Sequence, residues 1–223
     1  MFLQSDSHLN VEAFPKDKYE DLQISFDFRT YQSKGLLIYH PLKWGHLKIF
    51  MQDSRLKTIL ANSKEVIQLD SFDLAYDDGH WHTCQVKLSV LKLNFTIDSE
   101  TLIRYIKSPS KSSNRFLIGD SGQLQKESSQ MPGFIGNIKN LKLWSNTKYT
   151  DLKIVDNEKV VTGLAYMDDK CWPNPCQNGG VCKQNASDFH CECEGTGYMG
   201  SMCHTSLFYR SCMDFSALNP STK

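Results

Sequence analysis

The chain has 223 residues, of which 40% are hydrophobic and 22% are charged, and this is ordinary for a globular protein with room for one sizeable and one small domain. The formal net charge of zero argues against a large basic surface for nucleic acid or for an anionic membrane. No apolar run approaches the length of a transmembrane helix.

Apolar and polar residues alternate with a period of two through the first 165 residues. The clearest alternating runs are 24–28, 47–51, 84–88 and 93–97. Strict alternation predicts antiparallel strands with one buried face. The parity changes between Val90 and Leu91, which predicts a tight turn at 89–92. Because no segment has the pattern of an amphipathic helix, we expect an all-β chain in which two sheets pack as a β-sandwich.

Five motifs in this region follow one another in the order found in laminin G-like domains. They are 24–30 (ISFDFRT), 35–39 (GLLIY), 78–82 (DGHWH), 116–119 (FLIG) and 133–136 (GFIG). Residues 1–166 therefore resemble a laminin G-like domain. The resemblance implies a jelly-roll β-sandwich of about 14 strands, with rim loops that bind protein or glycan ligands.

Many laminin G-like domains bind calcium at the rim, and this chain departs from their pattern. Alignment places His46 where the family has an aspartate ligand, and neutral imidazole is a poor ligand for calcium. The second ligand would come from 120–131, which offers Asp120 and Glu127. We expect Asp120 to serve its own loop backbone instead. We therefore expect the chain to bind no cofactor and no metal ion, and calcium in particular is disfavoured.

Two loop regions are candidates for ligand binding. The first is the rim formed by 43–46 and 119–131, with Trp44 as an aromatic anchor or, alternatively, as a rim packing residue. The second is a serine-rich loop with Lys107, Lys111 and Arg115, which could bind sulfate groups or could be a solvated loop.

Other reactive side chains in the first 165 residues favour structural roles. Cys84 lies on the apolar side of its strand, which predicts a buried free thiol; the alternative is a bridge to Cys212. His80 and His82 would share one face of a strand, but no further metal ligand is near in sequence. No serine stands in a G-x-S-x-G context, so we expect no enzyme.

Six cysteines lie between Cys171 and Cys203 with the spacing C-x4-C-x5-C-x8-C-x-C-x9-C. Such a density replaces a hydrophobic core with disulfide bridges and indicates an oxidising, extracellular compartment. The uneven spacings disfavour zinc. Sequence alone allows 15 ways of pairing six cysteines.

The cysteine spacing, with the glycines at 179–180 and at 197 and 200, makes residues 167–204 resemble an EGF-like domain. This resemblance implies that the small disulfide-rich module has the pairs Cys171–Cys182, Cys176–Cys191 and Cys193–Cys203. Lys170 and Gln184 stand where calcium-binding members carry ligands, so no calcium is expected here either. We expect 205–223 to be a tail or the start of a following domain.

The chain has two N-glycosylation sequons, at Asn94 and Asn185, and an extracellular location predicts a glycan on at least one of them. Because the first residues lack the pattern of a signal peptide, we expect a piece of a longer secreted or membrane-anchored protein. Pairs of laminin G-like and EGF-like domains recur in agrin, perlecan, Slit, neurexin, Crumbs and eyes shut proteins. The altered calcium and cysteine positions are most similar to the eyes shut and Crumbs group.

The predicted function is adhesion or matrix organisation through an extracellular protein or glycan ligand, such as a glycosaminoglycan. One alternative is a structural spacer in a long multidomain protein. Another is a sandwich that carries a small molecule between its sheets, although the many large core residues argue against a cavity.

Overall fold

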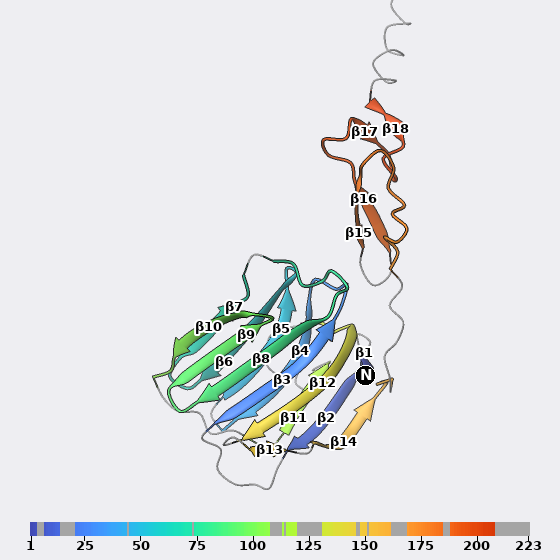
Figure 1. Ribbon diagram of the computed structural model, residues 1–223. Helices are drawn as coiled ribbons and strands as arrows, with labels where there is room; N and C mark the ends of the chain where they lie inside the picture. Colours follow the sequence, from blue (N-terminus) through green and yellow to red (C-terminus); the bar gives the residue numbers. More distant parts are fainter. Residues whose placement is uncertain are drawn as a thin grey trace, which may run out of the picture. The chain divides into compact units, whose positions relative to one another are not determined.

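The computed structural model describes residues 1–3, 7–13, 21–43, 45–72, 74–107, 113, 115–119, 131–145, 148–150, 152–161, 169–184 and 188–207 (Figure 1). The chain divides into two compact units, Met1–Met167 and Asp168–Lys223, which are described separately below. The domain boundary expected from the sequence lies between 166 and 167. Within the described residues, no helix is long and apolar enough to cross a membrane.

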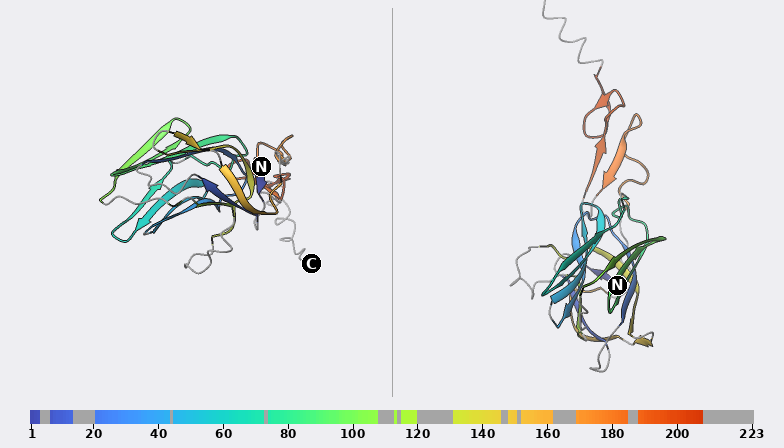
Figure 2. Two further views of the ribbon diagram at one scale, coloured as in Figure 1. Left: turned by 90° about the horizontal axis from the view of Figure 1, so that it is seen from below. Right: turned by 90° about the vertical axis from the view of Figure 1, so that its left-hand side faces the viewer.

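The first unit is a sandwich of two seven-stranded sheets, which lie as two layers in Figure 2. In sheet A the order is β1 (Phe2–Leu3), β12 (Gly136–Ser145), β3 (Leu22–Arg29), β8 (His82–Ser89), β9 (Lys92–Ile97) and β10 (Glu100–Tyr105), with β13 (Lys148–Thr150) also paired to β12. In sheet B the order is β14 (Leu152–Glu158), β2 (His8–Ala13), β11 (Arg115–Gly119), β4 (Gly35–Leu42), β5 (Gly45–Gln52), β6 (Arg55–Asn62) and β7 (Val66–Asp70). The predicted all-β sandwich of about 14 strands is confirmed.

The core lies between the two sheets and is built by the alternation read from the sequence. Strands β3 and β8 bury every second residue, and β9 does the same from Leu93. Phe26, Phe28, Phe95 and Phe134 are at most 1% exposed and fill the space between the layers. The core recess lined by Ile24, Ile38 and Phe116, among others, is too small to admit a water molecule. This packing gives no support to a carrier site between the sheets.

Two local features of sheet A agree with the sequence analysis. Strand β8 ends at Ser89 and β9 begins at Lys92, with Leu88 opposite Leu93, so the tight turn predicted at 89–92 is present. Cys84 is a fully buried free thiol, and burial raises its pKa far above the ordinary value. The thiol therefore behaves as a small core hydrophobe. Cys212, its alternative partner, lies outside the described residues.

The second unit contains two short hairpins, one of β15 (Val181–Gln184) with β16 (Phe189–Glu192) and one of β17 (Tyr198–Met199) with β18 (Thr205–Ser206). Three disulfides join Cys171 to Cys182, Cys176 to Cys191 and Cys193 to Cys203. These are the pairs that the EGF-like resemblance implies.

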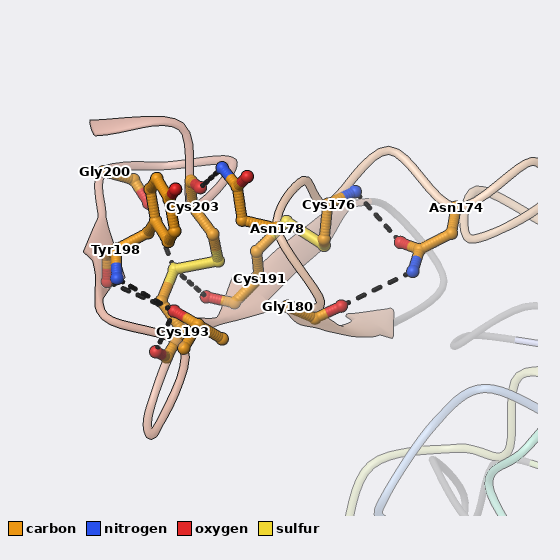
Figure 3. The surroundings of a disulfide bond; sticks show 10 residues. Asn174, Cys176, Asn178, Gly180, Cys191, Cys193, Tyr198, Gly200 and Cys203 are labelled. Atoms are coloured by element: carbon orange, nitrogen blue, oxygen red, sulfur yellow. Dashed lines mark hydrogen bonds between the residues drawn. A yellow bond between two sulfur atoms is a disulfide. The ribbon is translucent and has the colours of Figure 1, made fainter. Parts of the chain in front are cut away.

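The turn before β15 packs directly on the last disulfide (Figure 3). The Asn178 side chain donates a hydrogen bond of 2.8 Å to the carbonyl of Cys203. Gly180 is buried, and a Cβ at this position would collide with the sulfur of Cys203. A glycine is therefore required at position 180, because any larger side chain there would displace the disulfide.

Candidate functional site

The candidate site is built at one end of sheet B, where two hairpin turns lie side by side. Gly45 opens β5 and pairs with Leu42 on one side and with Asn62 on the other. The side-chain oxygen of Asn62 accepts hydrogen bonds from the backbone N–H groups of Lys64 (2.9 Å) and Glu65 (3.0 Å). This cap fixes the β6–β7 turn next to the β4–β5 turn that carries Lys43.

Two further segments, the residues after β10 and the start of β11, lie at the same end of sheet B. The Glu65 carboxylate accepts a 2.7 Å hydrogen bond from the backbone N–H of Lys107, just after β10. Figure 1 shows β7 and β10 at the same edge of the sandwich. Strand β11 starts at Arg115, and its Leu117 pairs with Tyr39, so Arg115 lies toward the Leu42 end of β4.

We call the exposed residues Lys43, Lys64, Lys107 and Arg115 the cationic end. In the sequence Lys43 belongs to one candidate loop and Lys107 and Arg115 to another, and the structure brings all three residues to the same end of sheet B. Lys64 was missed, because only the pairing of Gly45 with Asn62 places its turn beside Lys43. Lys111 and Trp44 lie outside the described residues.

A partly open hollow of about 280 Å³ lies beside Arg115, and its lining includes Asn10, Glu12 and Asp156. The Arg115 guanidinium is 3.4 Å from the Glu12 carboxylate, across one wall of this hollow. The volume is just below the range of ~300–1,000 Å³ typical of small-molecule sites. A ligand at this end would therefore extend over the surface rather than sit in an enclosed pocket.

His46 lies on the outer face of sheet B next to the cationic end. Its ring stacks on Tyr39, with centroids 5.5 Å apart and planes inclined by 26°. The Lys48 ammonium lies 5.7 Å from the centre of the same Tyr39 ring, within reach of a cation–π contact. His46, the residue expected at the position of a family calcium ligand, therefore has its ring packed against Tyr39.

The other predicted rim loop, 119–131, begins at the opposite end of β4. Ile118 pairs with Ile38, and Gly119 is one residue further on, whereas His46 pairs with Pro41. The register separates Gly119 from His46 by four residues along the sheet, or ~13 Å. Asp120 and Glu127 lie outside the described residues. The loops 43–46 and 119–131 thus do not leave sheet B at one common rim.

The histidines of the D-G-x-W-H turn form a separate polar cluster with two aspartates. His82 Nδ1 lies 2.9 Å from an Asp98 oxygen, and its Nε2 lies 3.0 Å from an Asp78 oxygen. His80 precedes β8 instead of sharing a strand face with His82, and its side chain is 82% exposed. The expectation that both lie on one strand is wrong, because Asp78 holds His80 in the turn by a 2.8 Å hydrogen bond to its N–H. In the part of the chain that the structure describes, no group of three or more His, Cys, Asp or Glu could hold a metal ion.

A two-sheet sandwich followed by a three-disulfide module is typical of extracellular proteins. The laminin G domain profile matches residues 28–146, and the EGF-like domain profile matches residues 171–201. The chain belongs to the laminin G domain family, with an EGF-like domain following the sandwich. Its disulfides and relatives place it outside the cell or in an ectodomain.

The chain is similar to two curated proteins along nearly its whole length. It is 31% identical to neurexin-4 of Drosophila melanogaster and 27% identical to contactin-associated protein 1 of Homo sapiens. The matches cover 95% and 92% of this chain but only 16% of each relative. Neurexins are among the proteins in which the sequence motifs predict this domain pair. The closer placement with eyes shut and Crumbs proteins stays a prediction.

Among solved structures, domains LG4-5 of the mouse laminin alpha1 chain superimpose with a TM-score of 0.60 at 18% identity. The match covers 70% of this chain and 44% of the laminin fragment. At this identity the likeness supports the laminin G fold and carries no conclusion about ligand.

Proposed function

We propose that the sandwich binds a sulfated extracellular glycan through the cationic end. The observation that carries this proposal is the meeting of Lys43, Lys64, Lys107 and Arg115 from four separate segments at one end of sheet B. Each of these side chains is exposed, so it can pair with an anion without the large desolvation penalty of a buried charge.

The shape of this end favours a long polyanion over a small ligand. The charges are spread over separate segments, and the hollow beside Arg115 is only partly enclosed. A chain with repeated sulfate groups can contact several cations at once, so weak pairs of ~0.2–1 kcal/mol each add up. Arg115 can bind a sulfate with two parallel N–H groups, whereas each lysine offers a point charge.

The test compares two triple variants on an immobilised heparin column. Lys43→Ala/Lys64→Ala/Lys107→Ala removes three charges from the cationic end. The control Lys34→Ala/Lys142→Ala/Lys183→Ala removes three exposed charges elsewhere. We expect the unmodified chain and the control to elute above an ionic strength of ~0.15 M, and the cationic-end variant to elute at or below it. If the two variants eluted at the same salt concentration, the position of the replaced lysines would not matter, and the site would be rejected.

A protein ligand and a spacer role are distinguished in the same experiment. If the unmodified chain itself elutes at or below physiological salt yet still binds extracellular matrix, and the cationic-end variant does not, the ligand of this end is a protein surface. If no form binds heparin or matrix, the chain is a spacer. Because His46 replaces the family's carboxylate, we expect a calcium chelator to leave elution unchanged.

A further inference from the structure

The sequon at Asn94 lies in the middle of β9, on the outer face of sheet A. Asn94 is directly opposite Lys87 of β8 and Ile103 of β10. Thr96, the third residue of the sequon, shares this face, and its hydroxyl oxygen is 2.9 Å from that of Thr101. Phe95 between them points into the core and is 1% exposed. The two residues that define the sequon are therefore on the outward side of the sheet.

Packing does not explain an asparagine at this position. Its side-chain oxygen is buried, and it has no hydrogen-bond partner among the described residues. A buried carbonyl without a partner costs ~1–3 kcal/mol, and asparagine is also a poor residue for a strand. Threonine or lysine would suit this half-buried strand position better.

The neighbouring strand presents apolar side chains that nothing in the described structure covers. Strand β10 is the last strand of sheet A, and there Ile103 is 41% and Tyr105 is 78% exposed. An edge strand with exposed apolar residues can pair with a second chain, so extracellular proteins gain from protecting it.

We propose that Asn94 carries an N-linked glycan whose first sugars cover β10 at Ile103. Directly opposite residues on one sheet face have Cβ atoms ~4.5–5.5 Å apart, so a sugar on Asn94 begins beside Ile103. The donor is a lipid-linked oligosaccharide diphosphate. Nδ2 of Asn94 bonds to C1 of its first sugar, the C1–O bond to the diphosphate breaks, and Nδ2 loses one proton. The lipid diphosphate leaves with the bonding electrons.

Two matched variants test attachment in chain secreted from mammalian cells with Asn185→Gln, which leaves Asn94 as the one sequon. Thr96→Ala removes the sequon and the contact between Thr96 and Thr101, whereas Thr101→Ala removes the same contact and keeps the sequon. We expect an N-glycan amidase to lower the mass of the Thr101→Ala chain by one glycan and to leave the Thr96→Ala chain unchanged. Secreted, folded Thr101→Ala chain without a glycan at Asn94 would overturn the proposal.

Coverage of β10 is tested by maleimide labelling of Ile103→Cys in a Cys212→Ser background. Buried Cys84 does not compete in the folded chain. We expect Ile103→Cys to react at least several-fold more slowly with the glycan than in the Thr96→Ala chain. Val66→Cys on β7, a position that is 71% exposed, should react at the same rate in the glycosylated chain and in the Thr96→Ala chain. Equal rates for Ile103→Cys would show that the glycan points away from β10.

Discussion

His82 shows how a single side chain ties the D-G-x-W-H turn to the sandwich. Its ring contacts Phe28 and Tyr76 and bridges Asp78, in the turn, to Asp98, at the end of β9. Burial disfavours the charged ring, but the hydrogen bonds and charges of the two aspartates outweigh it and raise the pKa of His82 above its ordinary value. The protonated ring can donate to both carboxylates, whereas the neutral ring can donate to only one.

We predict that this bridge makes stability depend on pH. Because the folded pKa is raised, the stabilisation is fully present below the unfolded value of ~6.5 and is lost as pH rises through the folded pKa. His82→Gln should therefore lower the free energy of unfolding by about 1 kcal/mol at pH 5.5 and by less at pH 8.5. Urea unfolding at the two pH values measures the difference.

The matched control for this prediction is His80→Gln. His80 contacts the same Asp78 at 3.3 Å, but its side chain is exposed, so we expect little change at either pH. A loss that is the same at pH 5.5 and pH 8.5 for His82→Gln would contradict the proposed role of its charge. The sequence motif identifies His82 as part of the turn, but it does not identify Asp98 as its hydrogen-bond partner. That partner depends on the β8–β9 register, which puts Cys84 opposite Ile97.

At the scale of elements, the strand that begins at Gly45 positions the cationic end. Gly45 has a φ of 152°, and a Cβ there would collide with the carbonyl of Ala61 on β6. The close pairing of β5 with β6 at this point is what holds the turns of Lys43 and Lys64 together. The sequence shows that residue 45 is a glycine. Only the β5–β6 register shows that this glycine approaches the backbone of Ala61.

We predict that Gly45→Ala destabilises the sandwich by about 2 kcal/mol and weakens heparin binding, because the two turns must move apart. Thermal unfolding and the heparin column measure the two effects. Ser63→Ala, an exposed change in the neighbouring turn, should alter neither. If Gly45→Ala lowers stability but leaves elution unchanged, the spacing of the turns does not matter for binding.

The elements also show how far the sequence could predict this molecule. Alternation predicted the strands of the core correctly, because each residue's side of a strand follows from its position alone. It did not predict that Phe50 would be buried with Leu36 and Leu117 in a second apolar cluster on sheet B. The sequence predicts that the candidate loops 43–46 and 119–131 belong to one rim, whereas the registers of β11 and β5 against β4 separate them. Contacts between distant segments depend on such registers, which no local pattern encodes.

At the scale of the whole chain, the two compact units depend on different forces. The sandwich buries a large apolar cluster, and its one cysteine, Cys84, is a free thiol. The second unit has Cys176 and Cys203 as its buried hydrophobic residues, among those described, and relies on three disulfides that span 10 to 15 residues each. Closing a loop of this size contributes ~3 kcal/mol.

We therefore predict that a reducing agent unfolds the second unit and leaves the sandwich folded. In dithiothreitol, amide hydrogen exchange should become fast across β15 and β16. It should stay slow across β3, β8 and β9, because no disulfide crosslinks those core strands. Cys193→Ser/Cys203→Ser should act in the same direction without a reductant. Elution from heparin should not change in either case, since the cationic end belongs to the sandwich. Loss of protection in β3 and β8 together with β15 would mean that the sandwich depends on the disulfide-rich module for its own stability.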